Sequence, residues 1–220
     1  MNEKKLTLAL EQALTRITRE TGLVGGVVDV IQGGKVTFTY HYGYADRENR
    51  IPMDQDTLFD VASTSKAWTV MLAAQAIDEG LLTWDGPIRD VIPEFQMTDE
   101  YAAAHLSVRD LASHRSGLPG HDFLREKIFG DRENLMRKLK DLEFSCGFRS
   151  KYQYNNHLFI LLGYLVERAR GGMLWEDQIV KYIAEPLGVD PIRFRGVKAD
   201  MTNIHPALPY CSDGYQAQRC

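Results

Sequence analysis

The sequence predicts an α+β fold in which an N-terminal helix and a β-hairpin precede a mostly helical region. Two observations lead to this class. Apolar and polar residues alternate only around the hairpin, whereas later apolar positions recur at helical spacing. We therefore divide the chain into residues 1–80, with the first helix, the hairpin and a second helix, and residues 81–220, a mostly helical region with an irregular tail.

The first elements can be justified in order. An amphipathic helix is predicted near the N-terminus by apolar residues at helical spacing: Leu6, Leu10, Leu14 and Ile17. Residues 27–31 form an apolar strand, and Gly33-Gly34 is a typical hairpin turn. The second strand is predicted by apolar residues at every other position: Val36, Phe38, Tyr40 and Tyr42.

Further helices are predicted at residues 67–77, 107–112, 132–142, 156–168 and 174–184. The 156–168 helix is apolar on most sides and is expected to be buried. From Asp190 onward the chain is expected to be irregular, without a strand. A hairpin alone is marginally stable, so the two predicted strands indicate an incomplete sheet.

Composition excludes several classes of protein. The 220 residues are 44 % apolar and 25 % charged, as in globular proteins, and the net charge is −4. No basic cluster is present, so we expect neither a nucleic-acid nor a membrane partner. The longest apolar run, Leu158–Leu162, is too short to span a bilayer.

The cysteines and the N-terminus indicate the compartment. Cys146, Cys211 and Cys220 are widely spaced, as is usual for free thiols in a reducing environment. The N-terminal segment is amphipathic and lacks the apolar core of an export signal. We therefore expect a cytoplasmic protein.

Ser63 and Lys66 carry the clearest chemical signal. Ser63 is expected at a helix N-terminus, where free N–H groups favour developing negative charge. Lys66 follows one turn later and can reach the serine, which needs a nearby base to become a nucleophile. Lys66 is the only charged residue between Asp60 and Asp78, and a lone ammonium on an apolar helix is costly unless paired or functional. The alternative is a lysine extending to solvent beside a serine that only caps the helix.

Tyr154 and Asn156 form a second candidate group, just before the buried helix. Two such residues in a loop can point into one cleft. A tyrosine near an ammonium can have a lowered pKa and act as a general base. The alternative is a half-buried tyrosine beside an asparagine that caps the helix.

Several short segments, distributed over most of the chain, resemble motifs of a known protein family. They lie at residues 43–46, 57–66, 79–85, 106–119, 154–156, 161–164 and 185–188, and include Ser63-Thr64-Ser65-Lys66 and Tyr154-Asn155-Asn156. In this order they resemble the serine beta-lactamase and penicillin-binding-protein superfamily. The similarity is to the branch of class C beta-lactamases, D-alanyl-D-alanine carboxypeptidases and related esterases. It implies a beta-lactamase/transpeptidase-like fold.

The resemblance also implies roles for individual residues. Ser63 would be the acyl-forming nucleophile, and Lys66 would assist its deprotonation. Tyr154 would be base and proton shuttle, and Asn156 would hydrogen-bond the substrate amide or Lys66. The backbone N–H of Ser63 would form half of the oxyanion hole. No metal or organic cofactor is implied, and the substrate would be a small-molecule or peptide ester or amide.

One family motif is absent. Relatives carry Lys or His, any residue, then Gly on a later strand that closes the cleft and supplies the second oxyanion donor. Nothing after Tyr154 matches, and His41-Tyr42-Gly43 fits only by coincidence, on a strand that precedes the nucleophile. The chain therefore resembles the N-terminal portion of such an enzyme: a fragment, a degenerate relative or a form completed by another subunit. Losing one oxyanion donor costs a factor of about 10² to 10³ in rate, and the exposed sheet edge favours self-association.

These observations predict a serine hydrolase that acts through an acyl-enzyme on Ser63, in the manner of an intracellular esterase or peptidase. The alternative is a catalytically silent scaffold used for binding or assembly. The absent motif favours that alternative. The presence of Ser63, Lys66, Tyr154 and Asn156 together argues against it, because a scaffold has no need of these residues as a set. His114 and His121-Asp122 match no metal-ligand spacing, so no metal site is expected.

Overall fold

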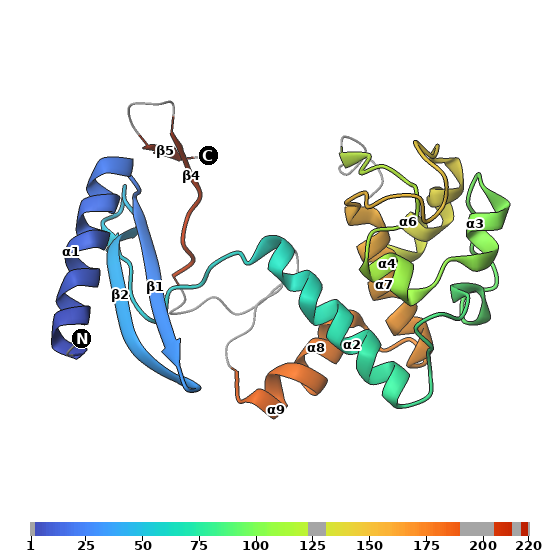
Figure 1. Cartoon of the computed structure of the whole chain (residues 1–220), viewed down its shortest axis with the longest axis horizontal. Helices are drawn as coiled ribbons and strands as arrows, with labels where there is room; N and C mark the ends of the chain where they lie inside the picture. Colours follow the sequence, from blue (N-terminus) through green and yellow to red (C-terminus); the bar gives the residue numbers. More distant parts are fainter. Residues whose placement is uncertain (1–2, 123–130, 190–204, 213–216, 220) are drawn as a thin grey trace. The chain divides into compact units, whose positions relative to one another are not determined.

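The computed structural model describes residues 3–122, 131–189, 205–212 and 217–219 (Figure 1). Two compact units are formed, one by Met1–Val61 with Lys198–Cys220 and the other by Ala62–Val197. This division does not coincide with the sequence-based boundary at residue 80. The predicted 67–77 helix packs on later helices, so it belongs to the second unit.

The first unit is built on an antiparallel sheet with the strand order β1-β2-β3. It contains α1 (Glu3–Thr21), β1 (Gly25–Gln32), β2 (Lys35–Asp46) and β3 (Ile51–Pro52). Val28 is paired with Tyr40, and the turn is made by Gly33 and Gly34 at φ +58° and +74°, a region that favours glycine. Figure 1 shows α1 beside the hairpin, where Thr15 and Tyr40 share a 3.0 Å hydrogen bond between their hydroxyl groups. The first helix, both strands and the turn are therefore confirmed.

The prediction of only two strands was wrong. Besides β3, a small antiparallel pair is formed by β4 (Tyr210–Ser212) and β5 (Ala217–Arg219). The backbone N–H of Leu208 donates to Ala45 O at 2.9 Å, and the Tyr210 hydroxyl donates to Glu48, so this segment is joined to β2 and the turn after it. Strands of two or three residues are too short to show alternation in a sequence. Residues 190–204 and Cys220, where an irregular tail was predicted, lie outside the described residues.

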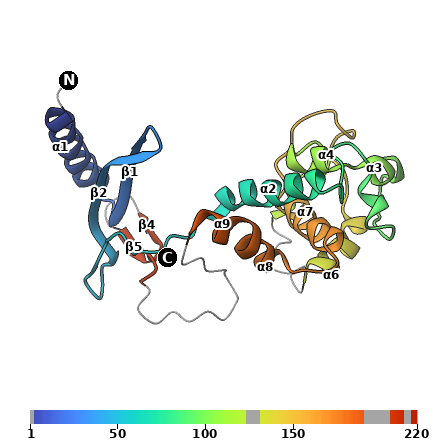
Figure 2. The same ribbon diagram turned by 90° about the horizontal axis from the view of Figure 1, so that it is seen from below.

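In the described part of the second unit, the named elements are helices joined by loops (Figure 2). Its elements are η1 (Ala62–Ser65), α2 (Lys66–Asp78), η2 (Ile88–Asp90), α3 (Glu100–His105), α4 (Val108–Ala112), α6 (Arg132–Lys138), η4 (Leu139–Asp141), α7 (Asn156–Ala169), α8 (Trp175–Ile179), the π-helical turn η5 (Val180–Ala184) and α9 (Glu185–Leu187). The helices predicted from periodicity are confirmed. The six-residue helix α3 was not predicted.

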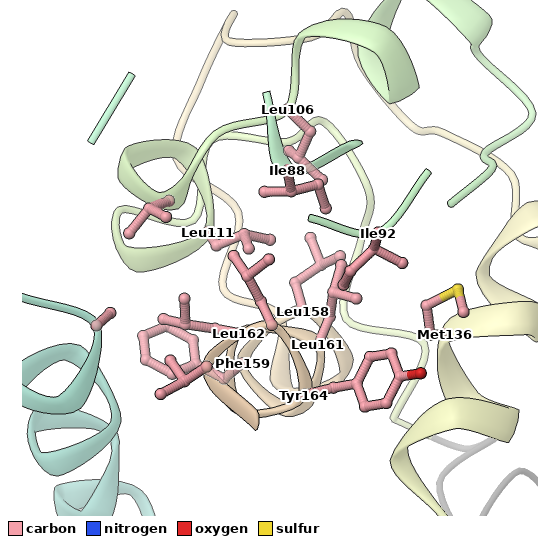
Figure 3. Close-up of a cluster of buried hydrophobic side chains, with 14 of the residues drawn as sticks. Ile88, Ile92, Leu106, Leu111, Met136, Leu158, Phe159, Leu161, Leu162 and Tyr164 are labelled. Atoms are coloured by element: carbon pink, nitrogen blue, oxygen red, sulfur yellow. The ribbon is translucent and has the colours of Figure 1, made fainter. Parts of the chain in front are cut away.

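The core of this unit surrounds α7. Figure 3 shows Leu158, Leu161 and Leu162 of α7 directed toward Ile88 and Leu111 of neighbouring segments. All three leucines have no exposed surface, so the prediction of a buried helix is confirmed. Burying a leucine side chain contributes about 1.5–3 kcal/mol, and this packing fixes the position of the loop that precedes α7.

The helix α2 packs against α7 and α8, but part of its apolar surface is exposed. Its buried residues are Thr69, Leu72, Ala73 and Ala76. Met71 on another face is 48 % exposed. The residues of α2 are apolar on nearly every side, but within this unit not every side of the helix is buried.

Among the described residues, no helix combines the length and the continuous apolar character that crossing a bilayer demands.

Candidate active site

Ser63 lies in the short helix η1, which continues directly into α2. The residue before it, Ala62, has φ +43°, a left-handed conformation that costs energy for any residue with a Cβ atom. After this turn the chain enters η1 with the Ser63 side chain exposed to solvent. The predicted position of Ser63 at a helix N-terminus is confirmed.

Lys66 begins α2, one helical turn after Ser63. Its ammonium donates a hydrogen bond to Ser63 Oγ at 3.0 Å. The same ammonium lies 4.8 Å from the ring centre of Tyr154 and 5.6 Å from that of Phe159. Two aromatic faces therefore hold the cation over the serine, because the ring faces carry negative electrostatic potential.

Tyr154 reaches the same serine from a position 91 residues later in the chain. Its hydroxyl donates to Ser63 Oγ at 2.7 Å, although Tyr154 is 39 % exposed. Burial raises the pKa of the phenol, but hydrogen bonds with Lys66 and Ser63 lower it more, so the pKa lies below the usual value of 10.0. This shift favours the phenolate, which is the form that can accept a proton.

Asn155 fixes the backbone on which Tyr154 stands. Its side-chain oxygen caps α7 by accepting from the N–H of Leu158 at 2.9 Å, and its amide nitrogen donates to Pro119 O at 2.6 Å. Asn155 has no exposed surface. The sequence analysis treated an asparagine cap of this helix and a tyrosine in the active site as alternatives. In the structure both occur, because Asn155 caps α7 while Tyr154 contacts Ser63.

The ring of His114 packs against the ring of Tyr154. Its ring centre lies 4.5 Å from that of Tyr154 and 4.8 Å from that of Phe159, and its Nδ1 accepts from the N–H of Asn155 at 3.1 Å. Burial, together with the charge of Lys66, lowers the pKa of His114. The ring packs on Tyr154, a contact that could not be predicted from spacing.

Asn156 does not join this cluster directly. Its amide nitrogen donates to Asp122 Oδ1 at 2.9 Å, and among the described side chains no hydrogen bond connects it to Lys66. Asp122 was considered only as part of a metal motif and had no sequence signal for this contact. In the described part of the chain, no group of three His, Cys, Asp or Glu residues is arranged to hold a metal ion.

The structure thus brings Ser63, Lys66 and Tyr154 into one cluster and places Asn156 beside it. The Beta-lactamase family model matches residues 10–206 of the chain. The chain belongs to the Beta-lactamase family. This family member is 32 % identical over 192 residues to a D-aminopeptidase from Brucella anthropi, covering 83 % of the chain and 35 % of that relative.

Two further similarities define the extent of the match. The esterase EstB from Burkholderia gladioli is 29 % identical over 226 residues, covering 96 % of this family member and 56 % of the esterase. The crystal structure of a class C beta-lactamase superposes with a TM-score of 0.81 and 26 % identity, covering all of this chain and 59 % of that one. The beta-lactamase/transpeptidase-like fold is therefore confirmed. The chain spans about one third of the D-aminopeptidase and just over half of the esterase.

Proposed function

We propose that the chain is a serine hydrolase that cleaves an ester or amide through an acyl-enzyme on Ser63. The observation that carries this proposal is the convergence on Ser63 Oγ of Lys66 Nζ at 3.0 Å and Tyr154 OH at 2.7 Å. A serine cap beside a solvated lysine would require no tyrosine at this point. The D-aminopeptidase and the esterase among the relatives support an amide or ester as substrate.

In the first step, the Tyr154 phenolate takes the proton of the Ser63 hydroxyl as Oγ forms a bond to the substrate carbonyl carbon. The carbonyl π electrons move to oxygen and give a tetrahedral oxyanion. By resemblance to the family, the backbone N–H of Ser63 would donate a hydrogen bond to this oxyanion. Lys66 remains an ammonium, and its charge stabilises both the phenolate before the step and the alkoxide that develops during it.

Collapse of the intermediate breaks the bond to the leaving group, which receives the proton from Tyr154. A water molecule then attacks the acyl ester, passing its proton to Tyr154, and the acid leaves when Ser63 regains a proton. The first and last proton transfers of this cycle pass through the 2.7 Å contact between Tyr154 OH and Ser63 Oγ. Neither a metal nor an organic cofactor takes part.

The test is intact-mass spectrometry after incubation with a fluorophosphonate and, separately, with a penicillin. We expect one stoichiometric adduct on the wild-type chain and none on Ser63→Ala or Lys66→Ala. Ser65→Ala is the matched control, because Ser65 lies on the same short helix but donates its hydroxyl to Ala62 O at 2.6 Å. It should label like the wild type.

Absence of an adduct from a chain shown to be folded would overturn the proposal. The silent scaffold would then be the better description of this chain. An adduct that survives Ser63→Ala would instead place the nucleophile elsewhere.

A further inference from the structure

A carboxylate stands at the edge of the candidate active site without a role in the proposed reaction. Asp122 is exposed, and its Oδ1 accepts from Asn156 Nδ2 at 2.9 Å. Asn156 follows Tyr154 by two residues, and the Tyr154 hydroxyl contacts Ser63 Oγ. The Asp122 carboxylate is therefore connected, through the Asn156 side chain and the backbone of residues 154–156, to the tyrosine that contacts Ser63.

The charge of Asp122 is not neutralised by a described basic side chain. Many other carboxylates in this unit form ion pairs with arginine: Glu79, Asp85, Glu94, Glu100, Asp110, Glu133, Glu167 and Glu176. Asp122 forms none with any lysine, arginine or histidine that the structure describes. As far as the described residues go, this anion is available to a cation that arrives with the substrate.

The Asp122 side chain is exposed, so its carboxylate can be reached from solvent. The backbone lies close to it at Gly120, where an added Cβ atom would stand 3.0 Å from Asp122 Oδ2. The Asp122 charge also reaches the catalytic cluster. Together with the larger effect of burial it raises the pKa of Tyr154, opposing the stronger influence of the hydrogen bonds with Lys66 and Ser63.

We propose, building on the proposed acyl transfer at Ser63, that Asp122 selects substrates carrying an ammonium group next to the scissile carbonyl. Asn156 holds Oδ1, which leaves Oδ2 to accept a charge-assisted hydrogen bond from the ammonium. The Lys66 ammonium, placed under the Tyr154 ring, repels a second cation from the position next to Ser63. Asp122 offsets that repulsion on the side where Asn156 lies.

A purely structural role would be to orient Asn156. Asp122→Asn separates the two roles, because the amide keeps an oxygen for the bond from Asn156 and loses only the charge. Glu143→Gln is the matched control, since it removes one exposed negative charge from a residue whose backbone carbonyl, and not its carboxylate, contacts His121.

The experiment measures kcat/KM for the benzyl esters of alanine and of N-acetylalanine, in both enantiomers, at a pH where the free amine is protonated. We expect Asp122→Asn to lose about tenfold on the alanine esters and to leave the acetylated esters at the wild-type rate or slightly above it. Glu143→Gln should retain the wild-type ratio. Equal losses on both kinds of ester, or no loss on either, would overturn the proposal.

Binding to Ser63→Ala distinguishes failure of this inference from failure of the proposed function. NMR titrations with alanine amide and N-acetylalanine amide should show tighter binding of the charged amide, and Asp122→Asn in the same background should abolish the difference. If the wild-type chain cleaves no ester but this difference is present, the charge-selective site stands without the hydrolase. If esters are cleaved with no charge preference, the hydrolase stands without the site.

Discussion

At the scale of single residues, Tyr154 and Lys66 donate to the same oxygen of Ser63. Both contacts hold the serine in place, but only a deprotonated partner can accept its proton. Burial opposes deprotonation of Tyr154, and the hydrogen bonds with Lys66 and Ser63 outweigh it, so the pKa of the phenol is lowered. In the proposed mechanism, this phenolate is the base and the Lys66 ammonium is its counter-ion.

This assignment predicts a pH dependence. The proposed base is present above the pKa of Tyr154, so the rate of Ser63 acylation should rise with pH, with its midpoint below the usual phenol pKa of 10.0. Tyr154→Phe should remove this rising limb and slow acylation by a factor of about 10² to 10⁴. The second-order rate of fluorophosphonate labelling, followed across the pH range by mass spectrometry, measures both effects.

Tyr152→Phe is the control for that experiment. Tyr152 packs edge-on against His114, with ring centres 5.4 Å apart, and it is 64 % exposed. Its variant should keep the wild-type profile. A Tyr154→Phe chain that labels at the wild-type rate would show that another group is the base.

The candidate site was only partly predictable from the residues. The spacing of Ser63 and Lys66 predicts their contact, because one helical turn separates them. No local pattern connects Tyr154 with them across 91 residues, so that contact depended on the family resemblance. The bond between Asn156 and Asp122 joins two loops through ordinary polar residues and had no sequence signal.

At the scale of elements, the N-terminus of α7 determines where Tyr154 points. Asn155 caps this helix and also donates to the carbonyls of Pro119 and Leu118. Its side chain therefore joins the helix to the loop that leads to Asp122. Loss of this residue affects two segments of the site at once.

We expect Asn155→Ala to destabilise the chain by about 2–4 kcal/mol, the sum of a lost cap and of buried carbonyls left without a donor. The comparison is Asp131→Ala, which removes the cap of α6 but only one exposed hydrogen bond, from Asn134 N–H at 2.7 Å, and should cost about 1 kcal/mol. Urea unfolding of both variants measures the difference. Equal losses would show that the contacts of Asn155 with Pro119 and Leu118 contribute nothing.

Element prediction succeeded where periodicity extends over several turns or strand positions. The helices α1 and α7 and the β1–β2 hairpin have long, regular patterns. The strands β3, β4 and β5 have two or three residues each, and their pairing is set by distant parts of the chain. Short elements of this kind take their conformation from tertiary contacts, which a local pattern does not record.

At the scale of the whole molecule, the outer edge of β1 remains a candidate surface for self-association. Among the described strands, β1 pairs only with β2. Ile31 near the end of β1 is 68 % exposed, and its partner Val36 on β2 is 60 % exposed. An unpaired edge with an apolar side chain is a template for pairing with another chain.

We predict concentration-dependent association of the chain, measured by sedimentation velocity. Ile31→Lys should weaken it, because an edge lysine disfavours pairing. Val36→Lys exposes the same charge on the paired strand and should have a smaller effect. If both variants associate like the wild type, the edge is not the contact surface.

The contact between Ser63 and Tyr154 also has a consequence in time. It closes a loop of 91 residues, so it cannot exist until the segments carrying α2 and α7 have come together. A reagent that attaches only to an activated Ser63 would then mark molecules at the moment their long-range packing is complete. If such a reagent is added in pulses during refolding, the fraction of labelled Ser63 at each time measures the fraction of molecules that have reached the native state.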